Sequence, residues 1–425
     1  MRRQAKIVHQ RNGKRRPAAG LLLLTLLICA SMLALAGCGE EEQSQEEPTS
    51  FEVAMITDST GVDDGSFRQN TWEGIQSFCE ESGTTCQYYV SKEDTDDSYI
   101  EAVRTARDAG AKICVFAGSQ FETTVHTAQQ EFEDLYFVLI DGVPRDSEYN
   151  YELAANSTGV LFAEEQAGYL AGYAAVCDGY TKLGFVGGKD LPAVKRYGAG
   201  FVQGISAAAK DRGLQGITVK YVYSGTFEAS KKIEKAATAW YEDGTEVIFA
   251  CGGAIGESVI AAADGGASEG KGSADEEGDA AEDSGSADKN DADAGSQDAE
   301  GAEGAPAGIG KVIGVDTDQS AMSPNVITSA KKRLDVAVTD LLKTYIHNSF
   351  KGNSIFNYTI ENNGISLEME NSRFNSFTQA DYDTLMQEIK TGKRSVSKEA
   401  LKGEISSLAG GGVTVEEIPQ DKFMK

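Results

Sequence analysis

The first half of the chain alternates short apolar runs with longer stretches of helical periodicity. The runs at 51–57, 86–90, 112–117 and 136–140 are rich in β-branched and aromatic residues and are bounded by Gly, Asp or Thr, so they predict strands. Apolar residues recur at helical spacing over 68–81, 97–109 and 121–132. This alternation predicts βαβ units and therefore an open, mostly parallel sheet with helices on both faces.

The same alternation then starts again. Strands are predicted at 182–186, 217–223, 246–250 and 311–315, and helices at 161–176, 193–211 and 229–241. We therefore expect an α/β protein with two doubly wound, mostly parallel sheets that face each other across a ligand cleft. In such sheets ligands bind beyond the carboxyl ends of the strands, so residues that follow strands are the candidates for chemistry.

These patterns suggest a domain organisation with two lobes. We expect a first lobe at 51–157, a second lobe at 158–324, a return to the first lobe at 325–355, and completion of the second lobe with a C-terminal tail at 356–425. One segment of the second lobe, 264–308, consists almost entirely of Ala, Gly, Ser, Asp and Glu. Because such a composition cannot form a core, this segment is expected to be a disordered acidic insertion.

The N-terminal segment has the pattern of an export signal. Basic residues precede an apolar run at 21–36 that ends in Leu-Ala-Gly-Cys, with the cysteine at position 38. Since the run is shorter than the roughly 20 residues that a bilayer requires, residues 1–37 are predicted to be a signal peptide. Leu-Ala-Gly-Cys resembles the bacterial lipobox, which implies a lipid anchor on Cys38. The polar, glutamate-rich residues 38–50 predict a solvated acidic tether.

Charge and cysteine content narrow the possible functions. The formal net charge of −27 and the pI near 4.5 exclude a nucleic-acid-binding surface, because phosphates would be repelled. The cysteine spacing matches no zinc site, and neither a metal nor a cofactor is predicted. Five cysteines beyond the anchor are expected to be buried thiols, with a disulfide between the first two as an open alternative: Cys79, Cys86, Cys114, Cys177 and Cys251.

A series of motifs runs through most of the chain. Residues 57–74 read TDSTGVDDGSFRQNTWEG, and the later motifs are FVLID at 137–141, EQAGYLAG at 165–172, FVGG at 185–188, GAGF at 198–201, IGVDTDQ at 313–319, and TS at 328–329 with Lys332 after them. In this order they resemble the basic-membrane-protein family of solute-binding lipoproteins, of the purine nucleoside receptor type. The resemblance implies a periplasmic-binding-protein clamp of type I. It also implies a monomer that delivers a nucleoside to an ABC permease at the outer face of the bacterial membrane.

Two phenylalanines are candidates for contacts to a nucleobase. A nucleoside requires a dry slot with aromatic faces for the base and hydrogen-bond partners for the ribose. Phe67 lies at the head of a predicted helix of the first lobe, and Phe227 lies in a turn after a strand of the second lobe. The resemblance implies that the two rings sandwich the base. The alternative is that each ring only packs its helix against the sheet.

Two aspartates each follow a predicted strand of the first lobe. Asp58 and Asp141 could be ordinary helix caps. The resemblance implies that both hydrogen-bond to the ligand, with Asp141 accepting from a purine ring N–H. Such an acceptor favours 6-oxopurines such as inosine and guanosine over adenosine. Arg68 stands where the family usually has an asparagine, which puts one polar contact to the base in doubt.

The second lobe supplies the candidates for the ribose. Asp316 ends a predicted strand and could accept from both hydroxyls of a cis-diol, with Asp318 on the same strand face as the competing candidate. Lys332, expected at the start of a helical stretch, would donate to the sugar, although it is one of three consecutive basic residues. Gly253 either lets the backbone approach the ligand or only forms a turn.

Two other classes of protein could use the same kind of α/β fold. An exported hydrolase or nucleosidase would need catalytic motifs, but beyond the signal segment only His126 and His347 remain, and no His-Glu-x-x-His or P-loop occurs. The one stretch that reads Gly-x-Ser-x-Gly, 266–270, lies in the acidic segment and does not follow a predicted strand, as a nucleophile elbow would. We therefore predict no enzyme. A surface signalling receptor would use the same clamp, and the sequence leaves that alternative open.

Overall fold

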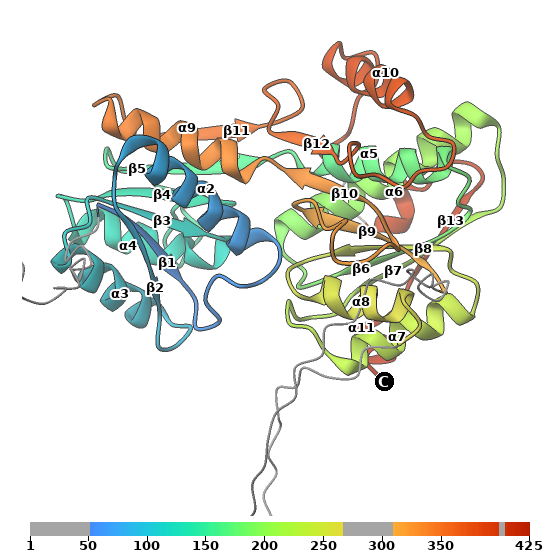
Figure 1. Cartoon of the computed structure of the whole chain (residues 1–425), viewed down its shortest axis with the longest axis horizontal. Helices are drawn as coiled ribbons and strands as arrows, with labels where there is room; N and C mark the ends of the chain where they lie inside the picture. Colours follow the sequence, from blue (N-terminus) through green and yellow to red (C-terminus); the bar gives the residue numbers. More distant parts are fainter. Residues whose placement is uncertain (1–51, 267–308, 399–403) are drawn as a thin grey trace, which may run out of the picture. The chain divides into compact units, whose positions relative to one another are not determined.

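The computed structural model describes residues 52–266, 309–398 and 404–425 (Figure 1). The predicted signal peptide at 1–37, Cys38, the tether at 38–50 and nearly all of the insertion at 264–308 lie outside these residues. Within the described part, no helix combines the length and the apolar character that a membrane span needs. The described residues form two separate β-sheets with helices on both faces of each.

The first sheet has six strands, all parallel, in the order β11-β5-β4-β3-β1-β2. Two of its inner strands, β1 and β3, are buried along their whole length, as expected for a sheet covered on both faces. The strands are β1 (Val53–Thr57), β2 (Cys86–Val90), β3 (Ile113–Ala117), β4 (Tyr136–Ile140), β5 (Ser157–Phe162) and β11 (Ser354–Tyr358).

Four helices cover the first sheet. Two of them, α2 and α9, pack together on one face, while α3 and α4 cover the other face (Figure 1). Their bounds are α2 (Phe67–Ser82), α3 (Asp96–Asp108), α4 (Glu122–Glu131, after the 3₁₀ turn η1, Ser119–Phe121) and α9 (Leu334–Ile346). Apolar residues at helical spacing on these helices supply the core on each side.

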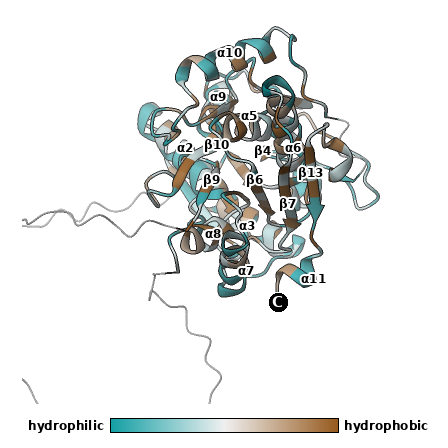
Figure 2. Cartoon of the chain, turned by 90° about the vertical axis from the view of Figure 1, so that its right-hand side faces the viewer, coloured by the Kyte–Doolittle hydropathy of each residue, from teal (hydrophilic) through white to brown (hydrophobic). Residues whose placement is uncertain are grey.

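The second sheet has seven strands in the order β12-β10-β9-β8-β6-β7-β13, with only β12 antiparallel to its neighbour. Figure 2 shows the strands β6 and β7 as strongly hydrophobic, which agrees with their burial between helices. The strands are β6 (Lys182–Gly187), β7 (Ile217–Tyr223), β8 (Val247–Cys251), β9 (Lys311–Asp316), β10 (Val326–Lys332), β12 (Ile365–Leu367) and β13 (Val413–Glu417).

Helices again cover both faces of this sheet. The pair α5 and α6 lies on one face, and α7, α8 and the short α11 lie on the other (Figure 1). Their bounds are α5 (Glu164–Cys177), α6 (Pro192–Arg212), α7 (Lys231–Glu242), α8 (Ile255–Ala263) and α11 (Gln420–Phe423), with α10 (Gln379–Lys390) and the 3₁₀ turn η3 (Ile405–Leu408) in the C-terminal part.

The contact between α5 and α6 is unusually close because both helices carry glycine where they cross. A Cβ atom at Gly168 would lie 2.0 Å from the carbonyl oxygen of Tyr197, and one at Gly200 would lie 2.0 Å from that of Glu165. Any side chain at these two positions would therefore push the helices apart. This packing holds the first turn of α5 beside the first turns of α6, next to the pocket described below.

The crossings between the sheets differ from the boundaries that we expected. The first lobe was expected to end at residue 157, but β5 pairs with β4 and β11 in the first sheet, so the chain crosses only after Phe162. The helix predicted at 161–176 begins at Glu164, because an apolar strand that runs directly into an apolar helix leaves no change of periodicity.

The later boundaries also differ. Residues 325–355 were expected to return to the first lobe, but β10 belongs to the second sheet, and the return consists of α9 and β11. The segment expected to complete the second lobe from residue 356 therefore starts inside β11, and the second sheet is rejoined at β12.

Candidate functional site

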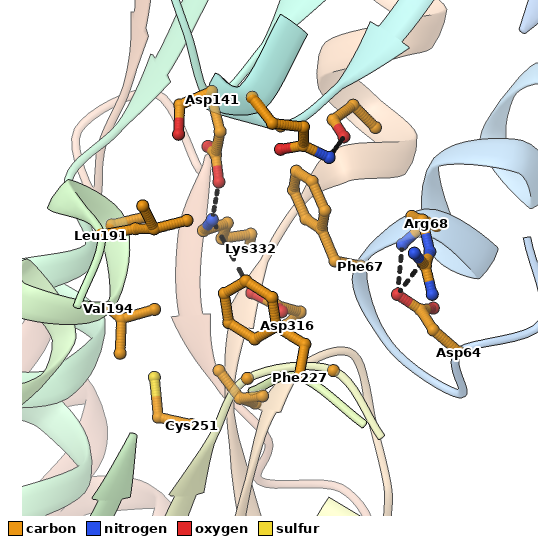
Figure 3. Close-up of a pocket in the computed structure, with 18 of the residues that line it drawn as sticks. Asp64, Phe67, Arg68, Asp141, Leu191, Val194, Phe227, Cys251, Asp316 and Lys332 are labelled. Atoms are coloured by element: carbon orange, nitrogen blue, oxygen red, sulfur yellow. Dashed lines mark hydrogen bonds and ion pairs between the residues drawn. The ribbon is translucent and has the colours of Figure 1, made fainter. Parts of the chain in front are cut away.

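A pocket lies at the carboxyl ends of the strands and is lined by residues of both sheets (Figure 3). Apolar side chains such as Leu191, Val194 and Val315 form part of its wall. The pocket also brings together all seven residues that were predicted to bind the ligand: Asp58, Phe67, Asp141, Phe227, Gly253, Asp316 and Lys332.

Two aspartates occupy equivalent places in the two sheets. Asp141 directly follows β4, and Asp316 is the last residue of β9. Both have a positive φ, 60° for Asp141 and 65° for Asp316, in the left-handed region that residues other than glycine rarely adopt. Such backbone conformations persist only where the surrounding structure holds them, and they gather at ligand sites. We therefore regard the two aspartates as the strongest candidates for ligand contacts.

Lys332 forms the electrostatic centre of the pocket. Its Nζ is paired with the carboxylate of Asp141 and lies 3.2 Å from Glu164 Oε1 and 3.8 Å from Asp316 Oδ1. The side chain is only 3% exposed. Burial alone would lower the pKa of Lys332, but the three carboxylates outweigh it and raise the pKa above its ordinary value, so the ammonium stays charged.

The position of Lys332 corrects one prediction. Lys332 is the last residue of strand β10 and does not begin a helix, and α9 starts only at Leu334. The two basic neighbours of Lys332 point to other partners: Lys331 pairs with Glu368 at 2.7 Å, and Arg333 pairs with Asp335. Of the three consecutive basic residues, the pocket contains Lys332 alone.

The competing ribose candidate lies outside the pocket. Asp318 Oδ1 accepts from the backbone N–H of Ser320, and its Oδ2 accepts from Asn371 Nδ2 at 2.9 Å. Asp316, in contrast, lines the pocket and accepts hydrogen bonds from Ser66 Oγ and from the hydroxyl of Tyr197, both at 3.1 Å. The structure thus leaves Asp316 as the candidate for the sugar.

Sequence reasoning missed a buried ion pair behind Lys332. Glu164, the first residue of α5, is completely buried, and its Oε2 accepts from Nε of Arg196 on α6. Although burial raises the pKa of Glu164, Arg196 and Lys332 outweigh that effect and lower it below the ordinary value. The close packing of α5 and α6 creates this pair, and the one signal in the sequence is the two carboxylates that open an otherwise apolar helix.

Phe67 and Phe227 approach the pocket from different sheets. The ring centroid of Phe67 lies 4.8 Å from Lys332 Nζ, close enough for a cation–π interaction. Phe227 sits against glycine backbone: a Cβ atom at Gly188 would lie 2.3 Å from its ring. Gly253 has a φ of 51°, and a Cβ atom there would lie 3.1 Å from the carbonyl oxygen of Phe227, so glycine suits both the turn and the ring.

Asp58 lines the pocket, but its carboxylate already has partners within the protein. It accepts from the backbone N–H and hydroxyl of Thr60 and, at 2.8 and 2.9 Å, from Arg68 Nη1. Asp64 accepts from three backbone N–H groups at the start of α2 and therefore acts as a helix cap. Arg68, the residue that departs from the family pattern, thus binds Asp58 and reduces its capacity as an acceptor.

Asp141 carries an unused acceptor. Its Oδ2 pairs with Lys332, while Oδ1 is buried and has no hydrogen-bond partner within the described residues. Burial raises the pKa of Asp141 from its ordinary value of 3.8 to about 7, against the opposing effect of Lys332. A buried acceptor without a partner costs roughly 1 to 3 kcal/mol, so a donor on a bound ligand would relieve that cost.

The raised pKa of Asp141 gives a pH prediction with opposite signs for binding and stability. Below about pH 7 the carboxyl becomes protonated and is no longer a charged acceptor, so inosine affinity should fall by up to about tenfold per pH unit. The ligand-free protein should instead gain stability from this group between pH 7 and 4, because the unfolded chain takes up that proton only near pH 4. Calorimetry and thermal unfolding of wild type and Asp141→Asn test both signs, and equal pH profiles in the two proteins would contradict this account.

Comparison with known proteins places this geometry in a family. The family model described as "ABC transporter substrate-binding protein PnrA-like" matches residues 51–272 and 303–400. Similar proteins include the "ABC transporter nucleoside-binding protein BmpA" of Lactococcus lactis, 28% identical over 83% of this chain and 92% of that protein. "Basic membrane protein A" of Borreliella burgdorferi is 26% identical over 86% of this chain and 93% of that protein.

Solved structures agree on the fold. A solute-binding protein of an ABC transporter system from Aeropyrum pernix K1 is similar with a TM-score of 0.63 and 19% identity, over 81% of this chain and 92% of that one. One from Conexibacter woesei has a TM-score of 0.58 and 20% identity, over 82% of this chain and 99% of that one.

The fold, the pocket and the family match lead to one conclusion. The described residues form two mostly parallel sheets, seven ligand candidates line one pocket, and the family model matches most of the chain. The chain belongs to the PnrA-like family of ABC transporter substrate-binding proteins.

Proposed function

We propose that this protein binds a purine nucleoside between Phe67 and Phe227 and delivers it to an ABC permease as a lipid-anchored receptor. One observation carries the proposal: the pocket combines these two aromatic side chains with the unpaired acceptor of Asp141 and the buried charges of Asp316 and Lys332. A base with a ring N–H and a sugar with two hydroxyls would engage all of these groups. The nucleoside-binding relative in Lactococcus lactis supports the same ligand class.

The free oxygen of Asp141 favours a particular class of base. In inosine and guanosine the ring nitrogen next to the 6-oxo group carries a hydrogen and can donate, whereas the same nitrogen in adenosine is an acceptor. An ionised carboxylate oxygen accepts hydrogen bonds but cannot donate one, so it would repel the acceptor nitrogen of adenosine. We therefore expect 6-oxopurine nucleosides to bind more tightly than adenosine.

The charge balance of the pocket favours an unphosphorylated ligand. Four carboxylates, Asp58, Asp64, Asp141 and Asp316, line the pocket together with two cations, Arg68 and Lys332, so four negative and two positive formal charges leave a net charge of −2. The Glu164 to Arg196 pair behind Lys332 adds no net charge. Each of these cations is already paired with a carboxylate. A nucleotide phosphate would meet repulsion here, while a neutral nucleoside would not.

The ribose contact is tested by Asp316→Asn. This change keeps the shape of the side chain but replaces a charged acceptor with an amide, so ribonucleoside affinity should fall by roughly ten- to a hundredfold, the equivalent of about 1.5 to 3 kcal/mol. Nucleosides that lack the 2′-hydroxyl should lose less. Calorimetry with inosine and 2′-deoxyinosine measures both effects, and an equal loss for the two ligands would contradict the assignment of Asp316 to the diol.

A thermal-shift screen tests the ligand class. Ligands that bind only the folded protein raise its melting temperature in proportion to the logarithm of their concentration over Kd. Inosine and guanosine should raise it most, adenosine less, and guanosine 5′-monophosphate, sugars and amino acids should leave it unchanged. A shift with sugars or amino acids and none with nucleosides would refute the proposed function.

The lipid anchor is tested separately, at Cys38. Cys38→Ala removes the sulfur that would carry the diacylglyceryl group, so radiolabelled palmitate should no longer enter the protein, which should remain as an unprocessed precursor or be released from the membrane. The wild-type chain expressed in the same cells is the control. Incorporation of palmitate into the Cys38→Ala variant would show that the lipobox interpretation is wrong.

A further inference from the structure

Two cysteines of the first sheet lie against each other. Cys79 is in the last turn of α2 and is buried, and Cys86 is the first residue of β2 and is half-buried. Both side chains pack in the same hydrophobic cluster, where α2 contacts β2, and each thiol affects the pKa of the other. The chain reaches one from the other through a tight turn, because α2 ends at Gly83, which has a φ of 71° and donates its N–H to the carbonyl oxygen of Cys79.

The other described cysteines lie on different elements. Cys114 is in β3, Cys251 ends β8, and Cys177 ends α5, where its sulfur accepts a hydrogen bond from Arg212 Nε at 3.1 Å. All three are buried. They therefore serve as internal controls for thiols that are enclosed by the core and have no cysteine on a neighbouring turn.

We propose that Cys79 and Cys86 form an intramolecular disulfide in the exported protein, which ties the end of α2 to the edge strand β2. Substrate-binding proteins of ABC importers act outside the cytoplasm, where disulfides form and persist. The first sheet is well placed for such a link, since β2 is its edge strand and has a neighbour on one side only.

Formation of this disulfide requires an oxidant that itself carries a disulfide. It proceeds in two steps, formation of a mixed disulfide and its resolution, and each thiol suits one of them. Cys86 is the more exposed of the two thiols, and the neighbouring Cys79 lowers its pKa, so Cys86 attacks the oxidant as a thiolate. The sulfur–sulfur bond of the oxidant breaks, and a mixed disulfide forms. Cys79 then attacks the Cys86 sulfur and expels the second sulfur of the oxidant. In sum two thiols lose two electrons and two protons, and the oxidant leaves as a dithiol.

Peptide mapping of the full-length protein tests this directly. Residues 69–92 contain no Lys or Arg before Lys92, so trypsin releases both cysteines on one peptide. Protein isolated from membranes without reductant, and alkylated while it is denatured, should give this peptide without label and two hydrogen atoms lighter than its reduced form. After reduction it should take up two labels. Peptides with Cys114, Cys177 and Cys251 should be labelled before reduction.

Labelling of either Cys79 or Cys86 before reduction would overturn the proposal. Single variants extend the test: in Cys79→Ser the remaining Cys86 should become labelled, and the reverse should hold in Cys86→Ser.

Reductant should lower the melting temperature of the wild type by roughly 2 to 5 °C, as expected for a short closed loop, and should not affect that of the double variant. Inosine affinity should stay unchanged, because Phe67 lies at the opposite end of α2. An equal melting temperature of the wild type with and without reductant would also overturn the proposal.

Discussion

Lys332→Met is expected to abolish measurable nucleoside binding, with a loss of at least a hundredfold, and to destabilise the ligand-free protein by about 3 to 5 kcal/mol. Methionine keeps the length of the side chain but removes the positive charge that contacts all three of Asp141, Glu164 and Asp316. The buried carboxylates then repel one another, and the sugar loses its donor. Calorimetry and denaturant unfolding measure the two effects.

The neighbouring lysine is a matched control. Lys331→Met changes the same residue type one position away, but Lys331 is 25% exposed and pairs with Glu368 outside the pocket. It should destabilise the protein less than Lys332→Met and leave affinity intact, because Glu368 keeps a hydrogen bond from the backbone N–H of Asn371. Adding Asp141→Asn to Lys332→Met should recover part of the stability without restoring binding. If Lys332→Met retained affinity for inosine, the central role of this lysine would be refuted.

Phe67→Ala and Phe227→Ala should each weaken nucleoside binding by roughly ten- to a hundredfold. Each change removes one face of the slot, and stacking of a base on an aromatic side chain is worth about 1 to 3 kcal/mol. Both side chains are only partly buried, so the fold should tolerate the changes better than the loss of a core phenylalanine.

The control for these variants is a phenylalanine outside the pocket. Phe350 is also partly buried and packs edge to face on Tyr136, with ring centroids 4.9 Å apart. Phe350→Ala should affect melting temperature but not affinity, whereas the two pocket variants should affect affinity in equal measure for inosine and guanosine. Unchanged affinity in both pocket variants would contradict the stacking model.

Much of the fold follows from the sequence because the strands are short and bounded by turn residues. The runs at 86–90, 136–140 and 217–223 have the bounds that periodicity predicted. Strands β5 and β10 were missed for a physical reason: each is buried and passes within two residues into an apolar helix, so no change from period 2 to period 3.6 marks the boundary.

The same reasoning explains why the register of Lys332 was ambiguous. In a helix, three consecutive side chains point in different directions around the axis, and the sequence gives no reason to choose among the three basic residues. In a strand, successive side chains point to opposite faces, so Lys332 is separated from Lys331 and Arg333. Once β10 is recognised as a strand, one lysine is directed to the site and its neighbours away from it.

The Glu164 to Arg196 pair could not be predicted from local sequence. Its two members are 32 residues apart and meet only because glycines let α5 and α6 approach closely. Contacts of this kind depend on how two helices cross, and neither helix alone encodes that crossing. The positions after strands, in contrast, follow from the general architecture of parallel sheets, which is why the sequence could propose Asp141 and Asp316 as candidates that line the same pocket.

The most direct test of the nucleoside clamp is a calorimetric titration of the wild-type protein with inosine, guanosine, adenosine and inosine 5′-monophosphate at pH 8, where Asp141 is ionised. We predict saturable binding of one inosine or guanosine per chain, weaker binding of adenosine, and no binding of the monophosphate. Absence of binding by all three nucleosides, or binding of the monophosphate as tight as that of inosine, would contradict the account.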